Sequence, residues 1–240
     1  TRALTMANLE PWQRYAWLAA YNVVYVDPNS TASTNVGTIE NPYTSMASLA
    51  NNAAIDIISV RANEDGTGNN LTVAGGLNLF NNQALISRNS DYEVFRIGTT
   101  PFVIPAAGTA GLRPLLSDPN MVAGGSVINL ANNNTVSGFQ IDASNAANTV
   151  FGNGVSNALP INGVNLQNNI FTDYVVGADL QDVSGRAIIS GNTFTGRPVT
   201  AAVRSTYGLN MSVAGNQTMD LLLTGNTATQ NQLAGLSVTA

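Results

Sequence analysis

The feature that most constrains the fold is a pattern of short apolar segments punctuated by asparagine and glycine, clearest after Gly124. In one set an aliphatic run ends at a corner rich in Asn and Gly, and its members are 136–141, 164–171, 188–194 and 222–228. A second set opens on glycine and consists of 163–166, 177–180, 208–211 and 235–238. Like segments recur mostly 23 to 34 residues apart. This period predicts a solenoid of stacked structural units.

The corners of such a solenoid account for the asparagines. Each short strand would lie about 4.8 Å above the previous one, with alternate side chains pointing into a shared core. Asn and Gly tolerate the left-handed backbone angles that tight corners need. At equivalent corners, Asn169, Asn192 and Asn226 are expected to pass side-chain hydrogen bonds from coil to coil. We therefore predict an all-β, right-handed parallel β-helix over 23–240, in which these asparagines have a structural role.

Two segments are expected to depart from the repeat. The first 22 residues predict a capping helix on the end of the domain, with Asn8 as cap and with Leu9, Trp12 and Tyr15 on one face. The alternative role for this helix is docking onto a neighbouring chain. The stretch 99–119 contains four prolines, which cannot donate to a strand ladder, so we expect an insertion or lateral loop there.

The N-terminal part carries three motifs in a fixed order. They are YVDP at 25–28, NPYTSM at 41–46 and DIISV at 56–60. This succession resembles the opening segment of the pectate-lyase-like superfamily of right-handed parallel β-helices, in which a strand and a polar loop lead into a short helix and a second strand. The sequence departs from that pattern at 54–56, where the superfamily usually has a Pro-Gly turn. The resemblance implies the β-helix fold and a secreted or cell-surface bacterial protein.

Enzymes of that superfamily cleave acidic polysaccharides, either by lyase chemistry with Ca²⁺ and an Arg or Lys base, or by hydrolysis with clustered Asp. If this chain were such an enzyme, its site would be sought on consecutive coils of the most regular region, at Asp142, Asp173, Asp179, Asp182 and Arg186. Oxygen ligands suit Ca²⁺, and paired carboxylates suit glycoside hydrolysis. The alternative interpretation of these aspartates is that they are solvated turn residues, since Asp is enriched in turns.

The missing residue types weigh against catalysis. The chain contains no Cys, His or Lys, so all nine basic residues are Arg. This removes a thiol nucleophile, an imidazole base and the usual N/S zinc sites. The hydrolase motifs of the superfamily, Asn-Thr-Asp, Asp-Asp and Gly-His-Gly, are also absent. A net charge of −5 without a basic cluster leaves no electrostatic basis for nucleic-acid binding.

We therefore expect a non-catalytic structural or adhesive protein outside the cell, such as a surface stalk, a passenger or a filament subunit, without a cofactor. The alternatives are a polysaccharide lyase or glycoside hydrolase, with Ca²⁺ as the fitting cation, and a carbohydrate-binding module. The last repeat runs to Ala240 without a polar cap, which solenoid ends need. This predicts self-association or continuation of the solenoid at that end, in a fragment of a longer chain. No apolar run reaches the length of a transmembrane helix.

Overall fold

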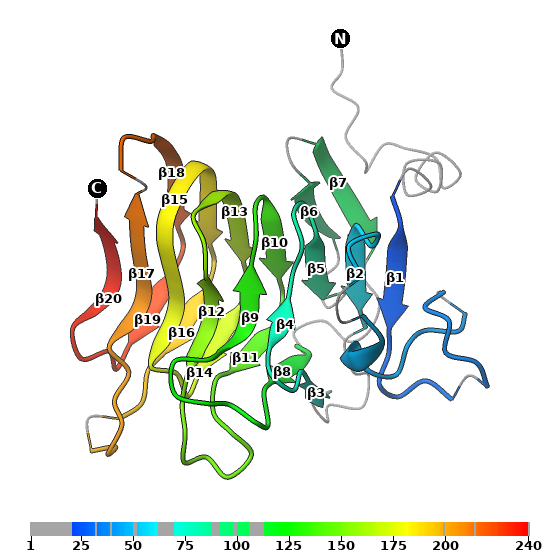
Figure 1. The fold of residues 1–240 in the computed structure, drawn as a ribbon, viewed down its shortest axis with the longest axis horizontal. Coiled ribbons are helices and arrows are strands. Elements are labelled where there is room, and N and C mark those ends of the chain that lie inside the picture. Colours follow the sequence, from blue (N-terminus) through cyan, green and yellow to red (C-terminus); the bar gives the residue numbers. More distant parts are fainter. Residues whose placement is uncertain are drawn as a thin grey trace.

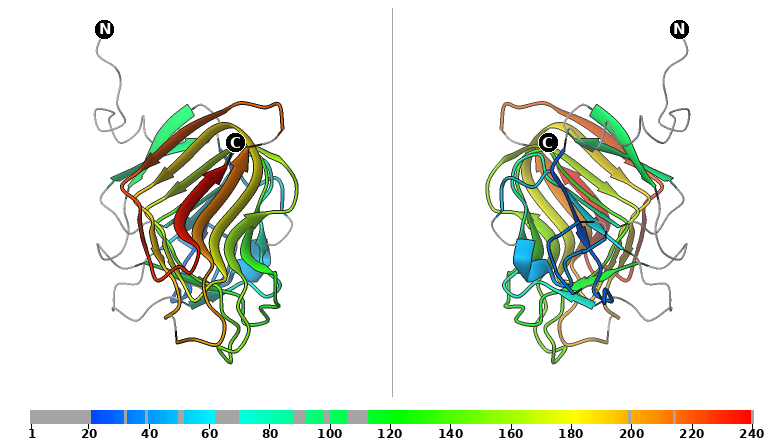
Figure 2. Two further views of the ribbon diagram at one scale, coloured as in Figure 1. Left: turned by 90° about the vertical axis from the view of Figure 1, so that its left-hand side faces the viewer. Right: turned by 90° about the vertical axis from the view of Figure 1, so that its right-hand side faces the viewer.

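The computed structural model describes residues 21–31, 33–38, 40–49, 52–61, 70–87, 92–97, 100–105, 113–198, 200–213 and 215–239. In these residues the chain forms a solenoid-like stack of parallel strands in two curled sheets (Figure 1). The strands lie behind one another when the stack is viewed from its ends (Figure 2). The only helical segment of the described part is a short 3₁₀ helix, η2 (Met46–Leu49). The helix expected over the first 22 residues, with Asn8, Leu9, Trp12 and Tyr15, lies outside the described residues except for Tyr21 and Asn22, which are not helical.

Sheet A is the larger sheet and has twelve strands. Its continuous order is β1-β2-β5-β10-β13-β15-β12-β9-β4, while β17 and β18 both pair with β15, and β20 pairs with β17. The strands of sheet A are β1 (Val23–Val26), β2 (Ile57–Val60), β4 (Leu77–Asn78), β5 (Ala84–Ser87), β9 (Ser126–Leu130), β10 (Asn134–Ser137), β12 (Asn153–Asn157), β13 (Ile161–Gln167), β15 (Val176–Ser190), β17 (Tyr207–Val213), β18 (Met219–Thr224) and β20 (Ala234–Thr239).

Sheet B has six short strands in the order β19-β16-β14-β11-β8-β3. They are β3 (Asn70–Thr72), β8 (Leu115–Ser117), β11 (Gln140–Asp142), β14 (Ile170–Thr172), β16 (Thr193–Thr195) and β19 (Thr227–Thr229). From β10 onward the chain moves repeatedly from sheet A to sheet B and back, so each circuit adds one strand beside the previous one in sheet B. β1 lies at one end of the stack, and β18, β19 and β20 lie at the other (Figure 1).

The strand register confirms the repeat predicted from the sequence. Leu166 lies beside Ile189, and Ile189 lies beside Leu223, so equivalent positions fall within the expected period. β15 is long because it belongs to two such rows. Its first half pairs with β12 and β17 and its second half with β13 and β18, and the register shifts between Leu180 and Val183.

The Pro-rich stretch 99–119 contains two strands with different environments. β7 (Thr100–Pro105) pairs antiparallel with β6 (Tyr92–Ile97) in a separate two-stranded sheet. β8 instead belongs to the stack, because it pairs in parallel with β3 and β11 in sheet B. The stack therefore resumes inside the stretch where the prolines predict an insertion.

The core is built from rows of side chains that run along the stack. Phe171 and Phe194 occupy equivalent positions on β14 and β16, and their rings stack with centroids 4.7 Å apart. Both side chains are fully buried. Glycine makes room for them: a Cβ at Gly177 would lie 2.6 Å from Cδ1 of Phe194 and 2.5 Å from the carbonyl oxygen of Gly208. The glycine that opens this repeat therefore leaves space for the core.

The corner asparagines form the predicted ladder between sheets A and B. The amide of Asn169 bonds to the side chain of Asn192, and Asn192 bonds in the same way to Asn226, at 3.1 and 3.0 Å. Asn169 and Asn192 are completely buried. The sequence prediction of a structural role for these corner residues is confirmed.

Candidate functional site

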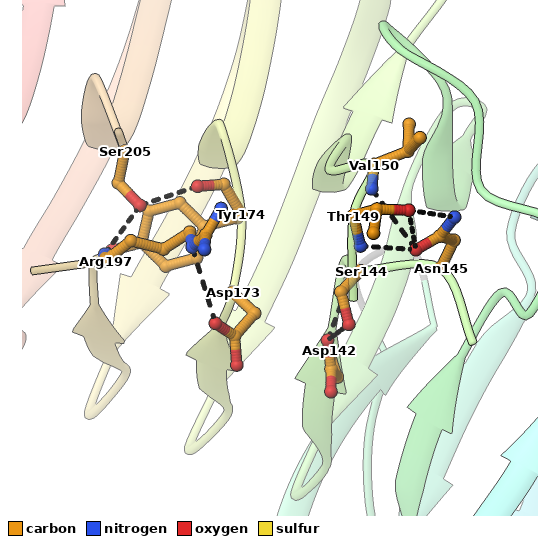
Figure 3. Close-up of polar contacts among 9 residues, drawn as sticks. All are labelled: Asp142, Ser144, Asn145, Thr149, Val150, Asp173, Tyr174, Arg197 and Ser205. Atoms are coloured by element: carbon orange, nitrogen blue, oxygen red, sulfur yellow. Dashed lines mark hydrogen bonds and ion pairs between the residues drawn. The ribbon is translucent and has the colours of Figure 1, made fainter. Parts of the chain in front are cut away.

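Two of the five acidic and basic candidates from the sequence, Asp142 and Asp173, are brought together on sheet B (Figure 3). Asp142 ends β11, and its partner in the register is Thr172, the last residue of β14. Asp173 is the next residue and has a left-handed φ of 50°. Because β11 and β14 are parallel neighbours, their carboxyl ends place the two carboxylates on adjacent coils.

The surroundings of Asp173 favour its neutral form. Partial burial raises the pKa of this carboxyl above its ordinary value, and the negative charge of Asp142 raises it further. The guanidinium of Arg197 opposes both effects, since its Nε lies 3.7 Å from Oδ1 of Asp173. The net result is a raised pKa, so repulsion and desolvation exceed the attraction to Arg197.

Arg197 is the centre of this cluster, although the sequence did not single it out. Its guanidinium carbon lies 3.5 Å from the centroid of the Phe151 ring, a cation–π contact, and its side chain is only 16% exposed. One guanidinium nitrogen, Nη1, is buried without a hydrogen-bond partner. The backbone N–H of Arg197 donates to Oγ of Ser205, and that hydroxyl donates to the carbonyl of Tyr174 (Figure 3).

Tyr174 is held next to this cluster by its own hydrogen bond. Its side chain is fully buried, and its hydroxyl donates to Oδ1 of Asn231 at 3.0 Å. Burial raises the pKa of the Tyr174 hydroxyl, so the group stays protonated. Asp142 has a local role as well, because its Oδ1 accepts bonds from both the N–H and the hydroxyl of Ser144. Tyr174 therefore links two coils, and Asp142 fixes the turn that follows β11.

The other three candidates lie on β15 in sheet A and are not joined to this cluster by any described contact. Asp179 accepts hydrogen bonds from Gln181 and Asn210. Arg186 pairs with Asp220 at 3.2 Å, and both side chains are more than half exposed. Exposed ion pairs of this kind contribute little to stability.

Asp182 occupies a bend of β15. It is exposed and has a φ of 55°, and its backbone N–H donates to Ser212. Its position matches the turn interpretation of this residue more closely than a place in a carboxylate pair.

A groove that the sequence did not reveal lies beside β4, β9 and the turn before β13. It has a volume of about 390 Å³ and is lined by neutral residues, among them Asn78, Asn81, Asn129 and Asn132. The apolar part of the lining includes Leu159, whose side chain is 76% exposed. Volumes of this order accommodate small ligands. The sequence signal was the recurrence of Asn at 78, 81, 129 and 132, which belongs to no single contiguous motif.

The described part of the chain shows neither a cluster of metal-ligating side chains nor a membrane-spanning helix. No group of three or more His, Cys, Asp or Glu side chains is placed there to hold a metal ion. The same residues include no helix with the length and hydrophobicity to span a bilayer.

Comparison with known proteins found no matching family model, no similar curated protein and no similar solved structure.

Proposed function

We propose that the chain is a non-catalytic structural module outside the cell: a right-handed parallel β-helix of the pectate-lyase-like kind. The end of its stack formed by β18, β19 and β20 associates with a second copy or is continued by further coils. A surface stalk, a passenger or a filament subunit would have this organisation. The observation that carries the proposal is that rows of core side chains continue into these last strands and become exposed there.

Two rows make this change plain. Leu166 and Ile189 are completely buried, whereas the next residue of their row, Leu223, is 37% exposed. In the second row Leu180 and Met211 are completely buried, and Val238, the next residue, is 39% exposed. An apolar side chain that leaves water contributes about 25 cal/mol per Å² of buried area, so covering this end would be favourable.

The backbone at this end supports the same proposal. β18, β19 and β20 each pair with a preceding strand of their sheet and have no described strand on the other side. Edge strands present free N–H and C=O groups, which template the addition of a further strand. Backbone pairing and apolar contact would therefore act together on one surface.

The polar residues of the repeat weigh against catalysis. The corner asparagines are used by the ladder, Asp142 is engaged with Ser144, and Asp179 is engaged with Gln181 and Asn210. The location outside the cell is part of the proposal and draws support from the absence of thiols, which suits an oxidising environment. Labelling of intact cells with a membrane-impermeant reagent would test that location, and labelling only after lysis would count against it.

The association is tested by placing charges on the end of the stack. We expect the unaltered chain to associate as its concentration rises in sedimentation velocity, and the double variant Leu223→Glu, Val238→Glu to associate at least about tenfold more weakly, because burying unpaired carboxylates is costly. Val122→Glu is the matched control, since it alters an exposed aliphatic residue elsewhere. A chain that stays monomeric at every concentration would contradict the proposal.

A second candidate function is carbohydrate binding in the groove beside β4 and β9, favoured by its volume and its lining of neutral amides with an exposed leucine. The test is binding of soluble neutral and acidic oligosaccharides by calorimetry, with Asn129→Ala and Leu159→Ala as variants. Loss of binding in both would support this function, and an unaltered chain that binds none of the sugars would contradict it.

The enzyme alternative is tested on uronate polymers with added Ca²⁺. Turnover that is lost in Asp173→Asn or Asp179→Ala would favour it over the structural proposal. Absence of any turnover dependent on these residues would remove it.

A further inference from the structure

The interior asparagine ladder follows one rule at each step. Nδ2 of Asn192 donates to the carbonyl of Leu166, three residues before the preceding ladder residue, Asn169. Oδ1 of Asn192 accepts from the backbone N–H of Asn169 at 3.0 Å and from its Nδ2 at 3.1 Å. One carboxamide on a following coil thus satisfies two donors and one acceptor of the coil before it.

The next step repeats this geometry. Nδ2 of Asn226 donates to the carbonyl of Ile189, again three residues before the preceding ladder residue. Oδ1 of Asn226 accepts from the backbone N–H and the Nδ2 of Asn192, both at 3.0 Å. At the start of the ladder, where the preceding coil has Phe139 in place of an asparagine, only the backbone N–H donates: that of Phe139 donates to Oδ1 of Asn169 at 3.1 Å.

The last described coil presents the same groups, and the described residues include no coil beyond it. The backbone N–H of Asn226 has no partner among the described residues, and Nδ2 of Asn226 makes one bond where the ladder uses two. Leu223 is the equivalent of Ile189 in the register. The carbonyl of Ile189 faces the following coil, where it accepts from Asn226, so the carbonyl of Leu223 faces away from β15 in the same way. These three groups, which we term the end socket, form the arrangement that a carboxamide satisfies inside the stack.

We propose that the end socket recognises an asparagine on an incoming parallel strand of a partner, at the corner where that strand ends. The apolar surface beside it specifies a second feature of the same strand. Leu223 continues a buried row on β18, so the partner strand that pairs beside β18 carries an aliphatic residue three positions before its asparagine, as Ile189 stands before Asn192. This inference rests on the proposed end-on association and names the partner chemistry that would direct it.

The chemistry of the socket discriminates among related side chains. An aspartate accepts from the two donors but cannot donate to the Leu223 carbonyl, and it brings a charge next to that oxygen. An alanine leaves all three groups unpaired, which is unfavourable once water is excluded. A glutamine carries the same amide one methylene farther from its backbone, so it cannot reach the three groups from the same corner position.

The test uses a fluorescent peptide with the sequence of residues 185–195, which contains Ile189 and Asn192, and the full chain as its receptor. We expect this peptide to bind at least about tenfold more tightly than its Asn192→Ala and Asn192→Asp versions in fluorescence anisotropy. Leu223→Glu in the receptor should abolish binding, whereas Val122→Glu, at an exposed aliphatic residue elsewhere, should leave it unchanged. Hydrogen exchange at the backbone N–H of Asn226 should slow when the asparagine peptide is added, and should not slow with the Asn192→Ala or Asn192→Asp versions.

The outcomes separate this inference from the proposed function. Equal binding of the three peptides, or binding of none, overturns the end socket, while concentration-dependent association that is sensitive to Leu223→Glu would still uphold the structural proposal. Selective binding of the asparagine peptide by a chain that stays monomeric upholds the socket and contradicts self-association.

Discussion

At the scale of single residues, the buried amides and carboxylates differ in how well their surroundings satisfy them. The buried ladder residues Asn169 and Asn192 have their side-chain amides and backbone N–H groups engaged inside the stack, which is the condition under which a buried polar group does not destabilise a fold. Asp173 is the opposite case, because its charged form is opposed by burial and by Asp142. Substitutions at the two kinds of position should therefore have opposite effects.

Asn192→Ala is expected to lower the free energy of unfolding by about 2 to 4 kcal/mol, because it leaves the backbone N–H of Asn169 and the carbonyl of Leu166 buried without hydrogen-bond partners. Urea denaturation monitored by circular dichroism measures the loss. Asn226→Ala is the matched variant at the last step of the ladder, where the side chain is only half-buried, so its loss should be smaller. Equal losses in the two variants would contradict this account of the ladder.

Asp173→Asn is expected to stabilise the chain more at pH 7 than at acidic pH. Because the pKa of Asp173 in the folded chain lies above the ordinary value of 3.8, the folded state binds this proton more tightly than the unfolded state does. The stability contributed by this group is therefore complete below 3.8 and is lost as the pH rises through the raised pKa.

Asparagine also tolerates the left-handed backbone at position 173. The measurement is the difference in unfolding free energy between variant and parent at pH 3.5 and pH 7, with Asp220→Asn as the control for removing one exposed carboxylate. A difference that is the same at both pH values would refute the electrostatic interpretation.

At the scale of elements, packing between sheets A and B depends on small residues opposite large ones. Gly154, Gly177, Gly208 and Gly235 occupy one row of sheet A. The first three face the rings of Phe171 or Phe194, and the fourth faces Ala228. This packing is a property of the row, since the side chains that these glycines face lie on the strands of sheet B.

Gly177→Ala is expected to lower the free energy of unfolding by about 2 to 3 kcal/mol, because the new Cβ overlaps a buried ring and a backbone carbonyl. Thermal and urea denaturation would measure this loss of stability. Gly235→Ala should cost less, since its new Cβ meets only the Ala228 side chain of the last coil at 2.8 Å. A variant at position 177 as stable as the parent would show that the core tolerates the added methyl group.

At the scale of the whole molecule, stability rests on stacking and amide bonding far more than on charge. Charged residues make up 10% of the chain, and the described ion pairs of Arg61, Arg186 and Arg197 all include a substantially exposed carboxylate or guanidinium. Each coil contacts chiefly its neighbours, so stability should be close to a sum of coil and interface contributions.

The unfolding free energy is expected to change by less than about 1 kcal/mol between pH 7 and 9, because the chain has no His, Cys or Lys side chain to titrate there. Urea midpoints at pH 7, 8 and 9 measure this. The same midpoints in low and high NaCl serve as the control for screened surface charge. A clear loss of stability in this range would show that the α-amino group or a tyrosine is coupled to folding.

Much of the fold could be predicted from the sequence, because local chemistry repeats with the coil. The Asn/Gly corners and the alternation of apolar residues determined the parallel stack, its period and the roles of Asn169, Asn192 and Asn226, since each follows from a short local pattern that recurs along the chain. The start of β8 inside the Pro-rich stretch could not be predicted, because its pairing with β3 and β11 links distant segments.

The candidate site was decided by the tertiary structure for the same reason. Five charged residues on consecutive coils look equivalent in the sequence, yet the route of the chain places Asp142 and Asp173 on sheet B and the other three on sheet A. Arg197 and Phe151 meet only because separate coils stack. The sequence by itself determined which residues turn, stack and fill the core, and only the tertiary structure decided which of them meet, since contact between coils depends on register and not on proximity along the chain.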